Sequence, residues 1–217
     1  MGRKKILIVS GVEPGKVLSG KDILQISISK FVEVCPDIRV IVILPPGKIA
    51  FWQQYCTISN FNCPQTLIPA AFTPFHSVRK ALEKIPDGAI VAIHDGARPL
   101  VSHALIGRIF ERMEAGARAV VPVIPAPGSV MQEGEDGLAP GLGAAIAQTP
   151  QLFRVEDLRQ AYAQAYDTRF TDPASIVAGI KIPLTPVEGE RYNIRIDTPE
   201  DLVAAGALSR ALTAGNK

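Results

Sequence analysis

Short hydrophobic runs without polar alternation recur along the chain, and longer amphipathic stretches separate them. The runs cover residues 6–10, 40–44, 89–94 and 119–123. Runs of this length that are rich in Ile and Val are typical of central strands covered by helices on both faces. The pattern therefore predicts an α/β fold with a largely parallel sheet.

The stretches between these strands carry apolar residues at helical spacing. They cover residues 22–34, 77–84, 102–115 and 155–165, and several follow a capping residue or a proline. An alternating order of strands and helices implies right-handed crossovers and a ligand site at the carboxyl ends of the strands. Motifs just after a strand are therefore the first candidates for function.

Two segments depart from this alternation. Residues 124–145 contain three prolines and five glycines without sustained periodicity, which predicts an arm that projects from the core. Insertions of this length are usually functional or disordered, and a lobe that grips a second subunit is one interpretation. Residues 198–201, Thr-Pro-Glu-Asp, combine a capping threonine, an early proline and first-turn acids, which predicts a final helix through Leu212.

Composition limits the classes of function. A chain of 217 residues with 47% hydrophobic residues is long enough for one substantial core, and we expect residues 1–217 to form one domain with the arm as an insertion. The formal net charge is +2, from 23 basic and 21 acidic residues spread along the chain. This balance predicts no nucleic-acid partner and fits a small anionic ligand better.

Cysteine and histidine spacing indicates neither a zinc site nor a redox motif. We interpret the cysteines as buried, reduced thiols and the histidines as structural: Cys35, Cys56, Cys63, His76, His94 and His103. The apolar run over residues 6–9 is too short for a signal peptide or a membrane span. These features predict a cytoplasmic protein without membrane association.

The strand over residues 89–94 ends in a motif, His-Asp-Gly-Ala-Arg-Pro at 94–99. An acid at a strand's carboxyl end, followed by glycine and arginine, places a hard oxygen ligand beside a phosphate-binding fork. Asp95 is therefore a candidate Mg²⁺ ligand, and Arg98 a candidate phosphate contact. The alternative is a strand-terminating turn in which Asp95 simply pairs with Arg98.

A second motif favours a different class of protein. Residues 15–21 fit the G-x-x-x-x-G-K pattern of a P-loop, and the apolar strand ending at Asp95 resembles the acidic strand that accompanies it. A P-loop next needs a Ser or Thr hydroxyl for Mg²⁺, but Asp22 stands there, and a carboxylate repels phosphates. A P-loop kinase or hydrolase is therefore the weaker interpretation.

Four segments in succession carry a resemblance to a known family. They are residues 94–99, 148–153 (QTPQLF), 171–175 (TDPAS) and 193–202 (NIRIDTPEDL). In order and spacing they resemble the signatures of the 2-C-methyl-D-erythritol 4-phosphate cytidylyltransferase family, and the similarity runs from about residue 40 to the C-terminus. The resemblance implies a three-layer α/β/α Rossmann-like nucleotidyltransferase fold with a mixed, mainly parallel sheet and a projecting β-arm.

The resemblance also implies an activity. It is the transfer of CMP from CTP to 2-C-methyl-D-erythritol 4-phosphate with release of pyrophosphate, a step of isoprenoid precursor biosynthesis. The acceptor phosphate attacks the α-phosphorus in line, and catalysis of this kind depends on positioning and charge neutralisation. Mg²⁺ and cationic side chains are therefore implied, as is a homodimer in which Arg98 contacts the sugar phosphate across the interface.

Further site residues follow from the resemblance, position by position. Asp95 matches the acid for metal and substrate, and Arg195 stands where the family usually has a phosphate-binding lysine. Thr149 and Thr171 match threonines of the substrate site, although such residues also fit a plain strand position and a helix cap. On the nucleotide side, the matching residues are Ser77 near the cytosine, Gly11 and Gly96.

The chain departs from the family pattern around the phosphates. The glycine-rich loop that holds the triphosphate is shortened to residues 10–21, and Lys16 is the surrogate for its missing cations. Pro74 and Gly141 stand near positions where arginines are expected. Ser129, assigned to the substrate side, belongs to a Gly-Ser pair that replaces Asp-Thr.

These losses leave two alternatives open. One is a catalytically degenerate family member that serves as a binding or assembly partner, since a fold does not by itself imply a function. The other is a cytidylyltransferase for a different sugar-alcohol phosphate, such as ribitol 5-phosphate. The residues of the sequence do not separate these alternatives.

Overall fold

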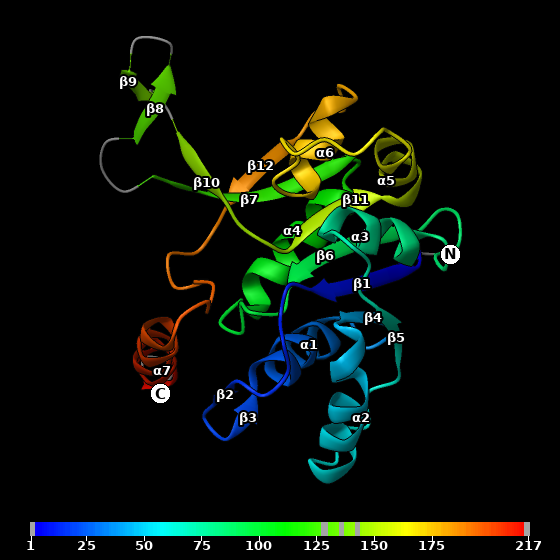
Figure 1. The fold of residues 1–217 in the computed structure, drawn as a ribbon, viewed down its shortest axis with the longest axis vertical. Helices are drawn as coiled ribbons and strands as arrows, with labels where there is room; N and C mark the ends of the chain where they lie inside the picture. The colour runs from blue at the N-terminus through cyan, green and yellow to red at the C-terminus, as the bar shows by residue number, and fades with distance from the viewer. Residues whose placement is uncertain (1–2, 127–129, 135–136, 142–143, 215–217) are drawn as a thin grey trace.

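A mixed sheet of eight strands forms the middle layer of the computed structural model, which describes residues 3–126, 130–134, 137–141 and 144–214 (Figure 1). The strands are β1 (Lys5–Ser10), β4 (Arg39–Leu44), β5 (Gln65–Pro69), β6 (Ile90–Asp95), β7 (Ala119–Pro125), β10 (Ala145–Ala147), β11 (Gln151–Arg154) and β12 (Thr185–Glu188). Their order is β10-β7-β11-β6-β1-β4-β5, with β12 beside β7. The β1 strand is parallel to β4 and β6, whereas β11 is antiparallel to β6 and β7. The expected mixed, mainly parallel sheet is confirmed.

Helices cover both faces of this sheet and complete the three layers. One face packs against α1 (Ile23–Val34), α2 (Ile49–Ile58) and α4 (His103–Glu114), and the other against α3 (Pro74–Leu82), α5 (Val155–Tyr162) and α6 (Pro173–Gly179). A 3-10 turn, η1 (Pro46–Lys48), precedes α2, and α7 (Pro199–Ala214) ends the described chain. Among the described helices, none combines the length and apolar character needed to cross a membrane.

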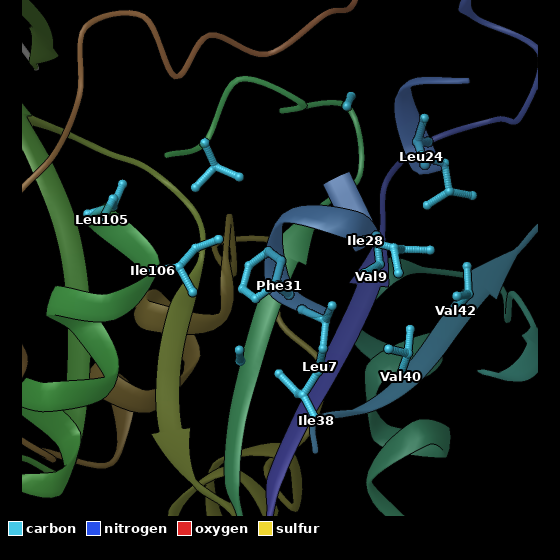
Figure 2. Packing of buried hydrophobic residues seen from close by; sticks show 14 of the residues in the cluster. Leu7, Val9, Leu24, Ile28, Phe31, Ile38, Val40, Val42, Leu105 and Ile106 are labelled. Carbon is cyan, nitrogen blue, oxygen red and sulfur yellow. The ribbon is translucent and has the colours of Figure 1, made fainter. Parts of the chain in front are cut away.

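The two faces of β1 show why both sides of the sheet are hydrophobic. Successive side chains of a strand point to opposite faces, and in β1 Leu7 and Val9 join one buried cluster while Ile6 and Ile8 join the other. Figure 2 shows the first cluster, where Phe31 of α1 lies close to Leu7. A strand buried on both sides must be apolar at every position, which explains the continuous runs in the sequence.

The predicted arm is present. Strands β8 (Val130–Gly134) and β9 (Gly137–Gly141) pair in antiparallel orientation and project from the sheet beyond β7 and β10 (Figure 1). The arm is shorter than the predicted insertion over residues 124–145. Pro125 and Ala145, near the two ends of that insertion, belong to paired strands of the main sheet.

Several element boundaries differ from the predicted ones. The helix predicted over residues 77–84 begins three residues earlier, because Thr73 caps it and Pro74 occupies its first turn. The helix predicted over 155–165 ends at Tyr162. The alternative reading of Thr171 as a helix cap was wrong by one residue, since Asp172 caps α6 in a capping box with Ser175.

Gly96 follows the carboxyl end of β6 and packs closely against buried side chains. Its amide donates to Ser10 O at 2.8 Å. A Cβ at this position would lie 2.5 Å from Val12 Cγ1 and 3.0 Å from Val9 Cγ1, closer than side chains tolerate. This glycine, predicted from the sequence to face the nucleotide, is therefore required for close packing.

We expect Gly96→Ala to lower the free energy of unfolding by about 1–3 kcal/mol, because the added methyl group overpacks against Val12. Gly107→Ala is the matched control, since a Cβ there meets no described atom within 4 Å in the interior of α4. That change should instead raise stability by about 0.5–1 kcal/mol. Urea denaturation of both variants measures the difference, and equal stability of Gly96→Ala and the unmodified protein would contradict the packing requirement.

Candidate functional site

Asp95 ends β6 and occupies the centre of the candidate site. In the sheet register it pairs with Ser10, the last residue of β1. Its carboxylate Oδ1 accepts a hydrogen bond from Ala97 N at 3.0 Å, and its side chain is 13% exposed. Two parallel strands therefore end together at the edge of the sheet where ligands of such folds bind.

Two arginines face this carboxylate, Arg98 from the same turn and Arg195 from a distant segment. Arg195 Nε lies 3.1 Å from Asp95 Oδ2 and 2.9 Å from Asp197 Oδ1, and Arg98 Nε lies 4.0 Å from Asp95 Oδ2. Burial raises the pKa of Asp95, and the charge of Arg195 opposes that rise. Burial likewise lowers the pKa of Arg98. The site therefore concentrates both signs of charge in a poorly hydrated place, as phosphate chemistry requires.

A closed ring of hydrogen bonds holds the segments around Asp95 together. His94 Nε2 bonds Arg98 O at 3.2 Å, and Arg98 Nη1 donates to Asn193 O at 2.7 Å. Asn193 Nδ2 donates to Thr149 O at 2.9 Å, and Thr149 Oγ1 lies 3.2 Å from His94 Nδ1. Asp95 N joins the ring by donating to Thr149 Oγ1 at 3.0 Å. Three of the four family segments therefore meet in one network.

The protonation of His94 fixes the direction of these bonds. Burial lowers its pKa to about 3, so the imidazole is neutral and carries one proton. Since a carbonyl can only accept, that proton is on Nε2 and is donated to Arg98 O. Nδ1 then accepts from the Thr149 hydroxyl, whose one proton is committed to this bond. His94 is structural, as predicted, and Thr149 shares that role.

A cavity of about 320 Å³ opens beside Gly11, at the end of β1. Gly11, Phe72 and Ser77 all line it. The buried Ser77 hydroxyl donates to Thr73 O at 2.8 Å and accepts from Ala71 N at 2.9 Å, so it shapes the turn before α3. Phe72 in that turn is fully exposed at the cavity rim. Two of the three residues predicted on the nucleotide side, Gly11 and Ser77, thus lie at one cavity, whereas Gly96 does not line it.

Gly11 connects this cavity with the charged centre. Its φ of +76° is in the left-handed region, and a Cβ there would lie 2.9 Å from Asp95 Oδ1. Only glycine lets the backbone approach the carboxylate so closely. The cavity and Asp95 are therefore adjoining parts of one site, whereas a larger groove of about 980 Å³ between α1 and α7 is lined by none of the predicted site residues.

The P-loop interpretation does not fit residues 15–22. Strands β2 (Val17–Leu18) and β3 (Lys21–Asp22) form a short antiparallel hairpin. Asp22 is fully buried, caps α1 by accepting from Leu24 N, and also accepts from Gly15 N. The Gly15 amide, which a P-loop would offer to phosphate, is bonded to a carboxylate instead.

Three predicted site residues remain: Lys16, Thr171 and Ser129. Lys16 Nζ lies 3.1 Å from both Ile196 O and Asp197 O, so it is beside the Arg195 segment. Thr171 is exposed, and its amide donates to Ser175 Oγ at the start of α6. Ser129 lies outside the described residues.

Three residues near the site were missed by sequence reasoning. Asn193 opens the last family segment but was given no role, and Asp197 lies in that same segment. Phe72 is a single aromatic residue between small and turn-forming residues, a pattern that gives little indication of a binding site. Asn193 bonds Arg98 and Thr149, Asp197 contacts Arg195, and Phe72 lines the cavity.

The proteins similar to this chain belong to one family. A sequence model of the family described as IspD, 2-C-methyl-D-erythritol 4-phosphate cytidylyltransferase, matches residues 16–211. The curated relative from Bacteroides fragilis is 36% identical over 194 residues, 88% of each chain. The relative from Porphyromonas gingivalis is 36% identical over 196 residues, covering 88% of this chain and 86% of its own. Both carry that same enzyme name.

Solved structures support the same grouping. The Francisella tularensis 2-C-methyl-D-erythritol 4-phosphate cytidylyltransferase has a TM-score of 0.77 at 27% identity, covering 94% of this chain and 99% of that chain. The 4-diphosphocytidyl-2C-methyl-D-erythritol synthase of Anaerococcus prevotii has a TM-score of 0.84 at 19% identity and covers 96% of both chains, a likeness that shows the fold alone.

The fold and the site together define a nucleotidyltransferase-type α/β protein, with an acid and cations at the carboxyl edge of a mixed sheet. The family match covers most of the chain and begins at Lys16, within residues 10–21. The chain belongs to the IspD family of 2-C-methyl-D-erythritol 4-phosphate cytidylyltransferases. The family, the fold class and the enzyme class predicted from the sequence are thereby confirmed.

The ring predicts a stability difference between two substitutions of Thr149. Thr149→Val keeps the shape but leaves Asp95 N and His94 Nδ1 without their partner, so the free energy of unfolding should fall by about 1–3 kcal/mol. Thr149→Ser keeps the hydroxyl and should lose less than about half of that. Chemical denaturation tests this, and equal losses in the two variants would contradict a role for the hydroxyl.

Proposed function

We propose that this chain transfers CMP from CTP to 2-C-methyl-D-erythritol 4-phosphate and releases pyrophosphate. The observation that carries the proposal is the meeting of Asp95, Arg98 and Arg195 at the edge of the sheet, beside the cavity lined by Gly11 and Ser77. Asp95 and Arg98 belong to the family segment 94–99, and Arg195 belongs to the segment 193–202. Their convergence supports a site for a phosphate donor and a phosphate acceptor.

Arg98 provides further support for an anionic ligand. Its side chain is 16% exposed, and its buried Nε has no hydrogen-bond partner among the described residues. A buried donor without a partner is unfavourable unless a ligand completes it. We assign Arg98 to the acceptor phosphate, together with Thr171 and Ser129.

The proposed reaction is an in-line displacement at phosphorus. An oxygen of the acceptor phosphate forms a bond to the α-phosphorus of CTP while the bond from that phosphorus to the bridging oxygen of pyrophosphate breaks. Arg195 lies where negative charge accumulates, and the low dielectric around Asp95 strengthens its effect. The cavity beside Gly11 takes the cytosine, with Phe72 at its rim.

The donor set around Asp95 fits Mg²⁺ shared with the nucleotide. No group of three His, Cys, Asp or Glu residues among the described ones forms a metal cage, but Mg²⁺ is commonly held by one or two carboxylates plus substrate phosphates. Asp95 and Asp197 both contact Arg195 Nε, so their carboxylates adjoin. When bound, the ion would neutralise charge on the triphosphate.

Assembly and location complete the proposal. We propose a homodimer in which the β8–β9 arm contacts a second subunit, since the arm projects from the main sheet (Figure 1). We further propose that residues 1–217 act as one domain in the cytoplasm.

The proposal is tested by binding of CTP with Mg²⁺ in a calorimeter, with ATP as the control nucleotide, followed by pyrophosphate release on addition of the acceptor. CTP-selective binding with release is expected. Binding without release would indicate a degenerate family member, and release only with ribitol 5-phosphate would contradict the assigned acceptor.

Asp95→Asn should reduce Mg²⁺-dependent pyrophosphate release by at least about a hundredfold, because the amide keeps the shape of the side chain but loses its charge. The variant should remain folded, since an amide oxygen still accepts from Ala97 N. Steady-state release and circular dichroism measure the two effects. Unchanged turnover in a folded Asp95→Asn protein would exclude the assigned role.

A further inference from the structure

We propose that Lys16 is a positioning residue, which acts by holding Arg195 beside Asp95. This inference rests on the proposed function, and it assigns Lys16 a role different from direct phosphate contact. Three observations carry it: the hairpin that presents Lys16, the two carbonyls it binds, and the way those carbonyls flank Arg195.

Lys16 immediately precedes the β2–β3 hairpin, whose two strands are hydrogen-bonded to each other. Ser19 and Gly20 connect β2 and β3 with positive φ angles of 51° and 80°, as in a tight type I′ turn. Asp22 closes the base of the hairpin by bonding Gly15 N, and its own amide donates to Tyr55 Oη at 2.8 Å. Leu18 is buried and faces α7 near Gly206. The shortened loop is therefore ordered by contacts within the hairpin and by contacts with α2 and α7.

Lys16 joins this hairpin to the segment that carries Arg195. Its ammonium nitrogen is 3.1 Å from Ile196 O and 3.1 Å from Asp197 O, across 180 and 181 residues of sequence. An ammonium group has three donors, and two of them are used on these carbonyls. Lys16 thus binds the backbone immediately after Arg195.

The same segment is held from its other side. Ile196 N donates to Ala97 O at 2.9 Å, and Asp201 Oδ2 accepts from Asp197 N and Thr198 N. These bonds still attach the segment to the fold without Lys16, so its removal should leave the fold intact while the segment gains local freedom. What Lys16 adds is the orientation of the two peptide groups next to Arg195.

Orientation matters here because Arg195 Nε lies between two carboxylates. It is 3.1 Å from Asp95 Oδ2 and 2.9 Å from Asp197 Oδ1. When the Asp197 carbonyl loses its tether, the guanidinium can follow Asp197 away from Asp95. Small displacements of a catalytic group have large effects on rate.

A double-mutant cycle separates positioning from direct phosphate contact. Residues that act through one another give non-additive losses, and independent contacts multiply. We expect Lys16→Met to lower kcat by about tenfold with little change in KM for CTP, and Arg195→Met to lower it by about a hundredfold. The double variant should then resemble Arg195→Met alone. Losses that multiply to about a thousandfold would overturn the proposal.

The matched control is Arg108→Met. Arg108 is also a cation that binds a distant backbone carbonyl, Glu188 O at 2.7 Å, but it lies on α4 and outside the site. This variant loses the same charge and the same kind of tether, so its kcat should stay within about twofold of the unmodified protein. A tenfold loss would show that removing any such tether has this effect, and would overturn the proposal.

Hydrogen exchange gives a readout that does not need catalysis. The amides of Ile196, Asp197 and Thr198 are hydrogen-bonded, and in Lys16→Met they should exchange at least about tenfold faster than in the unmodified protein or Arg108→Met. Unchanged exchange would refute the positioning role, even if the protein releases no pyrophosphate. Failure of the proposed function and failure of this inference are thus distinguishable.

Discussion

The hydrogen-bonded ring that joins His94, Arg98, Thr149 and Asn193 is the interaction on which the site depends. His94 and Asn193 are fully buried, and buried polar groups without partners are unfavourable, so every bond of the ring constrains the next. The four bonds of the ring hold the three segments together. The backbone of Asp95 is part of that arrangement, which places its carboxylate without further adjustment.

The sequence predicts the longer, fully buried strands of the sheet well and the shorter or less buried elements less well. Central strands such as β1 and β4 are apolar at almost every position because both faces are buried, and this pattern is visible along the chain. The strand β11 has only four residues, and α2 buries only Trp52 among its ten residues. Neither shows a periodicity that differs from irregular structure. Their existence is decided by tertiary contacts.

The same division holds for the site. The family segments predict that Asp95, Arg98, Thr149 and Arg195 belong together, and the structure brings these four side chains into one network. The segments do not predict that the Thr149 hydroxyl is used internally, because this follows from the neutral state of a buried histidine far away in sequence. Residue types indicate possible partners, whereas geometry decides which partner each group takes.

Arg195 stands where the family resemblance implies a lysine, and the neighbours of Arg195 show how a guanidinium can serve there. An ammonium is a compact charge that can turn toward any phosphate oxygen, whereas a guanidinium is a planar fork with fixed donor directions. Here Nε is used on two carboxylates while the side chain is 47% exposed, so the part of the fork that faces solvent is aimed by Asp95 and Asp197. A fixed direction is useful only if the backbone that carries it is also fixed. The hairpin and the arginine are therefore linked: Lys16 of the hairpin binds the backbone that carries Arg195.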